Sequence, residues 1–177
     1  MSQRHTAASA LALGFVALAP LARAEPELAP TAASPAPAAP QIWLAAFAEG
    51  AFGLEGAGFY NQLLGGRFDY RPEPRIALGI GVSYVNLKGP DGRVSNALPF
   101  SAFEWRAPLG RQTTLPVRFA SGYLPKNGPW LKAAVGLGQP IGELGVMTVE
   151  LLAPTLWVVG DQAVWSLDAS VELAFGL

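Results

Sequence analysis

Residues 163–177 read AVWSLDASVELAFGL and alternate without a break between apolar side chains and side chains that are mostly polar or small. A β-strand points successive side chains to opposite sides, so one face of this stretch is wholly apolar. The odd-numbered residues from Ala163 to Leu177 form the apolar face, and Asp168 and Glu172 lie on the other. The stretch predicts a long β-strand with one apolar side.

The chain from residue 41 onward repeats this texture, with apolar runs separated by short segments rich in glycine, proline, aspartate and asparagine. The alternation is clear around Ile76, Leu78 and Ile80, and less clean in the first and seventh runs. Proline cannot donate to a strand ladder, so Pro99, Pro116 and Pro154 predict local irregularities. The pattern predicts eight strands, at residues 42–54, 59–71, 75–87, 94–107, 114–124, 129–138, 144–159 and 163–176.

The first 40 residues have a different character. Arg4 is followed by an uncharged apolar run, and Ala22-Arg23-Ala24 fits the small-x-small rule for signal-peptide cleavage. The apolar run is shorter than the roughly 20 residues that a spanning helix needs. The following proline- and alanine-rich residues favour an extended linker. We therefore expect a signal peptide at 1–24, a periplasmic Pro/Ala-rich linker at 25–40 and a barrel at 41–177.

The composition favours a chain that meets lipid through strands. Charged residues make up 14% of the chain, against about 25% in soluble domains, and the mean hydropathy is +0.29. No segment after residue 24 offers the roughly 18 uninterrupted apolar residues of a spanning helix. Closed barrels are the other structure that satisfies every backbone polar group in a bilayer. An even number of strands would place both ends of the barrel chain on one side.

If the apolar face meets lipid, the charged side chains of the opposite face line the barrel interior. Buried charges are normally paired and hydrogen-bonded, and a balanced set can form an internal ion-pair network. The alternation assigns five basic and five acidic residues to this network, namely Arg67, Asp69, Arg71, Glu104, Arg106, Arg118, Lys132, Glu150, Asp168 and Glu172.

Many aromatic residues lie next to predicted turns or near strand ends. Outer-membrane barrels carry aromatic girdles at the two membrane–water interfaces. We therefore expect membrane-interface positions for Trp43, Tyr60, Tyr70, Trp105, Tyr123, Trp130, Trp157 and Trp165.

Over residues 41–177 the chain resembles the small eight-stranded outer-membrane barrels of the OmpA and OmpX type. The resemblance rests on the signal-like N-terminus, the strand number and the terminal strand. It implies an all-β, antiparallel up-and-down transmembrane barrel that is monomeric. The resemblance also implies that outer-membrane lipid surrounds the barrel and that the barrel-assembly machinery inserts it. Members of this family typically end on an aromatic residue, whereas here Leu177 is last and Phe175 is third from the end.

The mature chain lacks the residues of several common active sites. The only histidine, His5, would leave with the signal peptide, and there is no cysteine. Zinc sites built on these ligands and Ser–His or Cys–His nucleophile pairs are therefore excluded. No basic patch for nucleic acid exists.

We accordingly expect a non-enzymatic barrel with a side-chain-filled interior, no cofactor, no metal and a structural or envelope-associated role. Two alternatives stay open, the first because the inner face is polar and the second because alternation alone does not tell the inside from the outside. One is a narrow porin-like channel. The other is a soluble periplasmic, lipocalin-like barrel that binds a small apolar ligand.

Overall fold

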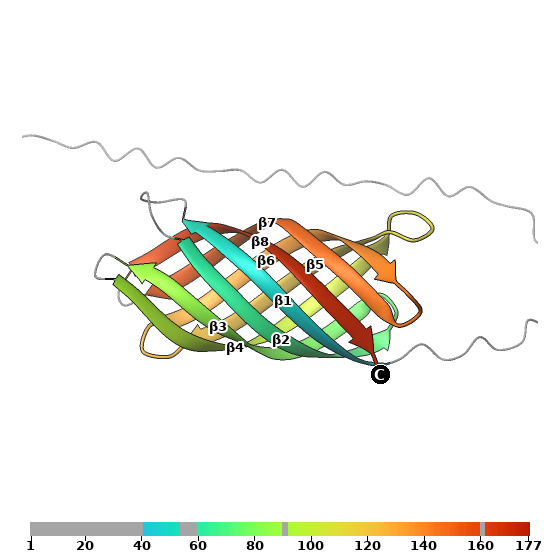
Figure 1. Cartoon of the computed structure of the whole chain (residues 1–177), viewed down its shortest axis with the longest axis horizontal. Helices are drawn as coiled ribbons and strands as arrows, with labels where there is room; N and C mark the ends of the chain where they lie inside the picture. Colours follow the sequence, from blue (N-terminus) through green and yellow to red (C-terminus); the bar gives the residue numbers. More distant parts are fainter. Residues whose placement is uncertain (1–40, 54–59, 90–91, 160–161) are drawn as a thin grey trace, which may run out of the picture. The chain divides into compact units, whose positions relative to one another are not determined.

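The structure is a computed structural model that describes residues 41–53, 60–89, 92–159 and 162–177. Each strand pairs antiparallel with the next strand in sequence, and β1 also pairs with β8, which closes the barrel (Figure 1). The predicted all-β, eight-stranded up-and-down barrel is confirmed. The strands are β1 (Ile42–Gly53), β2 (Tyr60–Glu73), β3 (Ile76–Gly89), β4 (Gly92–Pro108), β5 (Thr114–Leu124), β6 (Gly128–Ile141), β7 (Gly145–Val159) and β8 (Gln162–Gly176).

The barrel has two distinct ends. β1 begins and β8 ends at the same end, where the Leu177 amide donates to the Ile42 carbonyl at 2.9 Å. The turns at 74–75, 109–113 and 142–144 lie at this end, which we call the terminal end (Figure 1). Gly142 adopts a φ of 67°, a conformation that glycine reaches without strain. The opposite end, which carries the turn at 125–127, is called the distal end.

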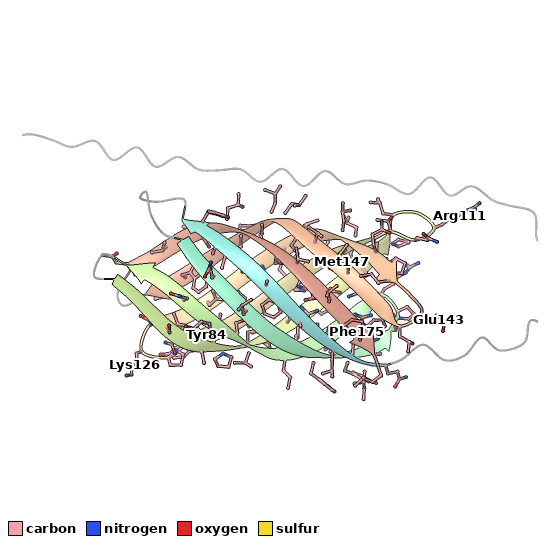
Figure 2. The ribbon with its side chains drawn as sticks, viewed as in Figure 1. Tyr84, Arg111, Lys126, Glu143, Met147 and Phe175 are labelled. Atoms are coloured by element: carbon pink, nitrogen blue, oxygen red, sulfur yellow. The ribbon has the colours of Figure 1, made fainter. Side chains whose placement is uncertain are left out.

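Side chains alternate between the interior and the exterior along the strands. In β8, Ser166, Asp168 and Glu172 are buried, whereas Trp165 and Leu173 are exposed. Ile80, on β3, is 67% exposed. Figure 2 shows side chains projecting from the outer surface of the ribbon. The apolar face is therefore outside and the ionic face inside, which is the reverse of a soluble barrel.

A β-bulge interrupts the alternation in β7. Glu150 pairs with Ser170 and Ala153 pairs with Asp168, so the register with β8 shifts between them. The intervening Leu151 and Leu152 are both exposed, at 65% and 62%. A bulge places two residues opposite one, and here it keeps two adjacent leucines on the outside. The irregularity predicted from Pro154 is thus a bulge that lies just before it.

The other two prolines leave their strands continuous. Pro99 pairs with Val82, and Pro116 pairs with Arg106, without a register shift. On the other side of β5, Thr114 pairs with Gly138 and Val117 pairs with Val135, so the register with β6 is the same before and after Pro116. Proline removes a single donor from a ladder, and both strands continue past it.

Two apolar clusters fill the ends of the interior. A small cluster of Trp43, Ala45 and Ala174 lies at the terminal end. A larger one, which we call the distal cluster, joins side chains from strand positions near the distal end. Its large members are Leu63, Val85, Leu98, Leu124, Trp130 and Trp157, with Phe100 packed against them.

Candidate functional site

Charged side chains from seven of the eight strands meet inside the barrel. All ten residues that the alternation assigns to the interior are buried, and so is Glu49 on β1. Among the described side chains β3 contributes no charge, because its inward positions there are small residues such as Ala77, Gly79 and Ser83. Small residues on one wall leave room for long side chains from the others.

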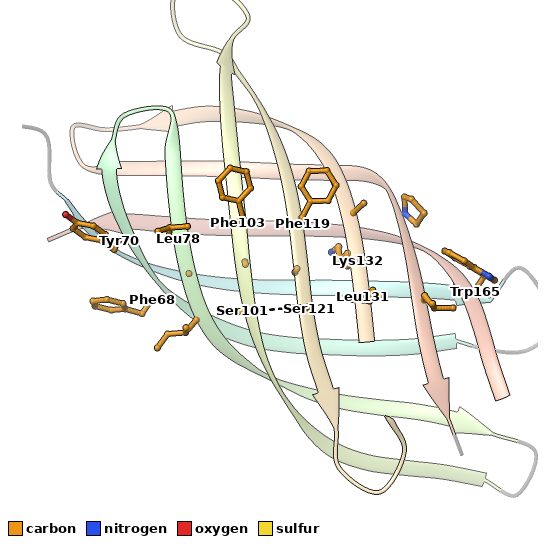
Figure 3. Close-up of a pocket in the computed structure, with 17 residues that line it drawn as sticks. Phe68, Tyr70, Leu78, Ser101, Phe103, Phe119, Ser121, Leu131, Lys132 and Trp165 are labelled. Atoms are coloured by element: carbon orange, nitrogen blue, oxygen red, sulfur yellow. Dashed lines mark hydrogen bonds between the residues drawn. The ribbon is translucent and has the colours of Figure 1, made fainter. Parts of the chain in front are cut away.

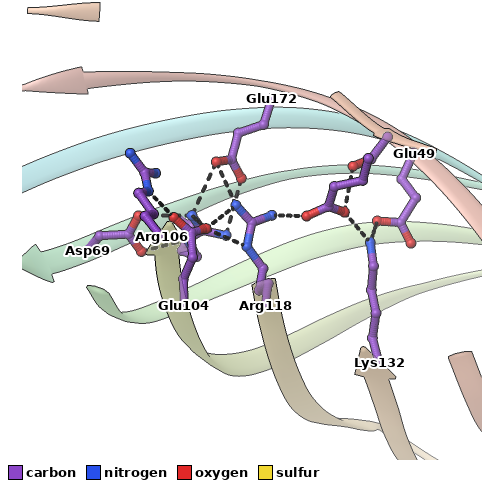
Figure 4. A network of polar contacts seen from close by, with 10 residues as sticks. Glu49, Asp69, Glu104, Arg106, Arg118, Lys132 and Glu172 are labelled. Carbon is purple, nitrogen blue, oxygen red and sulfur yellow. Dashed lines mark hydrogen bonds and ion pairs between the residues drawn. The ribbon is translucent and has the colours of Figure 1, made fainter. Parts of the chain in front are cut away.

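Arg118 on β5 is the centre of this ion-pair network (Figure 4). Its Nη2 donates to Glu104 Oε2 at 2.5 Å and to Glu172 Oε1 at 2.8 Å. Its Nη1 donates to Glu150 Oε1 at 2.6 Å. One guanidinium therefore joins carboxylates from β4, β7 and β8, which suits its fixed, planar set of donors.

Arg67 on β2 forms the second junction. Its Nε and Nη2 donate to the two oxygens of Asp69, at 2.6 and 2.9 Å, in a bidentate pair. Its Nη1 lies 3.1 Å from Glu172 Oε2. On the neighbouring strand, a Cβ at Gly79 would clash with Asp69 Oδ1 and lie 2.8 Å from Arg67 Cδ. Glycine at that position makes room for the pair.

Glu104 has a further basic partner, Arg106, whose Nε donates to Glu104 Oε1. At the other side of the network, Lys132 Nζ lies 2.5 Å from Glu49 Oε2 and 2.9 Å from Glu150 Oε2. Figure 4 shows Arg106 and Asp69 toward one side of the network and Lys132 and Glu49 toward the other. The ion pairs thus form one continuous chain across the lumen.

Glu49 is the member that sequence reasoning missed. The alternation of residues 42–54 is unclear, since alanine and glycine occupy positions on both faces. The available signal was its position, because Glu49 shares the parity of Trp43 and Ala45, both of which are buried. A carboxylate on an inward position of β1 balances Lys132 directly.

Asp168 is buried but makes no ion pair among the described residues. Thr155 Oγ1 and Ser166 Oγ each donate to its carboxylate at 2.6 Å. Trp157 Nε1 in turn donates to Ser166 Oγ at 2.8 Å. This chain of hydroxyl groups links the carboxylate to the distal cluster.

Arg71 also stays outside the network. Its guanidinium stacks over the Trp43 ring, with Cζ 3.6 Å from the ring centroid. Within the described part of the chain its Nε and Nη2 find no hydrogen-bond partner. The predicted set of ten is therefore divided, with eight members in the network and Asp168 and Arg71 held separately.

The predicted interface aromatics fall on both faces of the barrel. Trp43, Trp130 and Trp157 are buried inside it, so an interface position is wrong for these three. Nearness to a turn does not decide the face, which follows from strand parity and, for Trp157, from the bulge before it. The Tyr60 side chain lies outside the described residues. The remaining four face outward, namely Tyr70, Trp105, Tyr123 and Trp165.

A large groove lies on the outside of the barrel. This groove of about 930 Å³ is lined by outward-facing side chains such as Phe103, Phe119 and Leu131 (Figure 3). Ser101 and Ser121 face each other across β4 and β5 in it, with their hydroxyl oxygens 3.2 Å apart. Inside, a cavity of about 20 Å³ lies between the network and the distal cluster.

Among the described residues, no group of three or more histidine, cysteine, aspartate or glutamate side chains is arranged to hold a metal ion. In the same part of the chain, no helix has the length and apolar character needed to cross a membrane.

Comparison with known proteins identifies the fold. No family model matches the chain, and no curated protein matches it. The structure is similar to the crystal structure of Neisserial surface protein A, with a TM-score of 0.55 and 10% identity over 77% of this chain and 96% of the other. It is also similar to a structure from de novo design of transmembrane β-barrels, with a TM-score of 0.51 and 13% identity over 78% and 97% of the two chains.

A third similar structure is the N-terminal β-barrel domain of Pseudomonas aeruginosa OprF, with a TM-score of 0.47, 14% identity and coverage of 76% and 96%. At these identities the shared property is the architecture. Strand number, closure, antiparallel order and the outward apolar face together give this chain the fold of the small eight-stranded outer-membrane barrels of the OmpA and OmpX type.

Proposed function

We propose that this chain is a monomeric, integral outer-membrane protein without enzymatic activity, whose interior is filled by side chains and whose role is structural or envelope-associated. The observation that supports it best is the orientation of the two faces. Leu78, Ile80 and Val82 are half or more exposed on β3, whereas the ionic residues of the other strands lie inside. An apolar band of this kind is stable when acyl chains cover it.

The orientation argues against the soluble, lipocalin-like alternative. A soluble barrel would place its apolar face inside, where a small apolar ligand could bind. Here the inner face carries Arg118, Glu104 and Glu172, joined by ion pairs. A basic residue on the lipid side at mid-membrane would cost about 2–4 kcal/mol, so enclosing these charges in the lumen favours a membrane setting.

The packing of the distal cluster supports a closed interior over the narrow-channel alternative. Phe100 and Trp130 make an edge-to-face contact at 6.0 Å, and Trp130 and Trp157 make another at 6.0 Å. Phe47 packs against Phe100 at 5.8 Å. Eight-stranded barrels are just wide enough for side chains to fill. We expect purified protein in planar bilayers to give no steady conductance, and reproducible single-channel steps would favour the channel instead.

The proposal includes the location and partners that the sequence indicates. Residues 1–24 would direct export and be cleaved after Ala24, and residues 25–40 would form a periplasmic linker. The terminal end of the barrel would then face the periplasm. Outer-membrane lipid would surround the barrel, and the barrel-assembly machinery would insert it.

Cell fractionation tests the proposal. The full chain, expressed in a Gram-negative host, is expected in the outer-membrane fraction, resistant to extraction with urea and changed in gel mobility by boiling. Recovery of folded protein from the soluble periplasmic fraction would contradict the proposal.

A further inference from the structure

We propose that the terminal end of the barrel interior contains a binding site for a small oxyanion, a phosphate or a carboxylate, formed by Arg71 and Arg106. The site adjoins the ion-pair network, with which it shares Arg106, and does not depend on the membrane assignment. Its basis is a pair of buried guanidinium groups, some of whose N–H donors no described residue satisfies.

Arg71 supplies the main observation. The residue is 7% exposed, and its Nε and Nη2 are buried with no hydrogen-bond partner in the part of the chain that the structure describes. It makes no ion pair with any described residue, unlike Arg67, which comes from the same strand. Burial of an uncompensated cation is costly. The Trp43 ring fixes the guanidinium at 3.6 Å from its centroid but does not satisfy the in-plane donors.

Arg106 supplies a second cation next to the first. It is also 7% exposed, and its Nε donates to Glu104. Its Nη2 is buried and has no hydrogen-bond partner among the described residues. The two arginines interact electrostatically as like charges, while the Glu104 and Asp69 carboxylates attract Arg71 without forming an ion pair with it. Each therefore offers free donors in a region where their mutual repulsion is unfavourable.

The register places a small residue between the two arginine-bearing strands. Tyr70 pairs with Leu78 and Glu73 pairs with Ile76, with a register shift between them, so Arg71 and Pro72 both lie opposite Ala77 on β3. Ala77 in turn pairs with Glu104 on β4, two residues before Arg106. The methyl group of Ala77 is the only side chain that β3 places between the two arginine-bearing strands at this level. Both arginines also lie close to the turns of the terminal end, through which a solute would enter.

The chemistry of the donors defines the ligand. A guanidinium presents parallel N–H groups in a fork that matches two oxygens of one phosphate or carboxylate. An oxyanion between Arg71 and Arg106 would accept the unused N–H groups and offset the repulsion between the cations. A neutral sugar or an apolar molecule would do neither.

The test is a titration followed by arginine Nε–H NMR on the full chain, refolded in a neutral detergent. Inorganic phosphate is added at constant ionic strength, with chloride as the comparison ion. Saturable shifts of the Arg71 and Arg106 signals are expected with phosphate. Shifts that grow linearly with both ions, or signals that do not move, would overturn the proposal and indicate an adventitious ion only.

Two variants carry the same charge change. Arg71→Gln is expected to weaken phosphate binding about tenfold or more, from the loss of charge-assisted hydrogen bonds. Arg111→Gln, in the exposed turn at the same end, is expected to leave it unchanged (Figure 2). Because Arg71 makes no ion pair with a described residue, its replacement strands none of the described carboxylates. Boiling-dependent gel mobility checks that the variant folds. Equal weakening in both variants would overturn the site.

A further arm separates a free anion from a lipid headgroup. Phosphatidylglycerol is added to the micelles without inorganic phosphate. Shifts of the same two signals with the lipid alone would assign the site to headgroup phosphate, and shifts with inorganic phosphate alone would assign it to a soluble anion. Either result supports an oxyanion site, and the absence of both contradicts it.

Discussion

Arg118 on β5 donates through Nη2 to Glu172 on β8 at 2.8 Å, across two strands that are not neighbours in the sheet. The same guanidinium reaches Glu104 and Glu150. Backbone hydrogen bonds connect each strand only to its two neighbours. The ion pairs of Arg118 therefore link β5 through the lumen to β7 and β8, with which it shares no backbone hydrogen bonds.

Replacing Arg118 by methionine is expected to lower the free energy of unfolding by about 3–5 kcal/mol, because it leaves buried carboxylates without their shared partner. Urea unfolding in lipid vesicles, followed by gel mobility, measures the change. Arg111→Met, in an exposed turn, is the control and should alter stability by less than about 0.5 kcal/mol. Equal effects of the two substitutions would show that the network does not contribute to stability.

Gly79 is required by the Arg67–Asp69 pair. A Cβ there would lie 2.8 Å from Arg67 Cδ and clash with the carboxylate of Asp69. We expect Gly79→Ala to cost about 1–3 kcal/mol, as overpacking does. In Gly50→Ala the new methyl group would meet its nearest atom at 3.7 Å, so this change should be nearly neutral. The shift in urea midpoint compares them, and a tolerated Gly79→Ala would mean that the pair can move aside.

The bulge in β7 determines which of the later residues of that strand point into the barrel. Deleting Leu152 removes one of the two exposed leucines and keeps Thr155 and Trp157 facing inward, so we expect a closed barrel that still shows boiling-dependent gel mobility. Deleting Leu156 instead would turn Trp157 outward, because a one-residue slip exchanges the faces. The second deletion should be clearly less stable. The opposite order of stabilities would contradict the assigned bulge.

Ile80 tests the lipid-facing surface energetically. We expect Ile80→Arg to lower the stability of the folded barrel in vesicles by about 2–4 kcal/mol if it lies near the membrane midplane. Leu109→Arg is the matched control, since Leu109 is exposed in a turn of the terminal end. A soluble barrel would tolerate both substitutions equally, and that result would contradict the membrane assignment.

Much of the fold was predictable because a strand with one apolar face has a period of two residues. The interior positions of Arg67, Glu104 and Glu172 follow from parity in strands that alternate cleanly. The face of Trp157 was not predictable, because an unseen bulge inverts parity after Leu152.

The sequence also could not predict which charged side chains form ion pairs with one another inside the lumen. Parity places a charge inside but does not say which carboxylate it reaches, since that depends on shear and strand tilt around the closed barrel. For this reason Asp168, bonded to hydroxyl groups, and Arg71, stacked on Trp43, could not be distinguished from network members.

The most direct measurement uses two tryptophans at the same level on opposite faces. Trp165 pairs with Leu156, and Trp157, the next residue on β7, pairs with Val164, so the two indoles lie at a similar depth. Trp165 is exposed, whereas Trp157 is 1% exposed. Variants that retain only one of them, with the other tryptophans changed to phenylalanine, are refolded into vesicles whose acyl chains carry bromine. Strong quenching of Trp165 fluorescence and little quenching of Trp157 is the predicted result. Equal quenching of both, or quenching of neither, would contradict a barrel whose apolar face meets lipid.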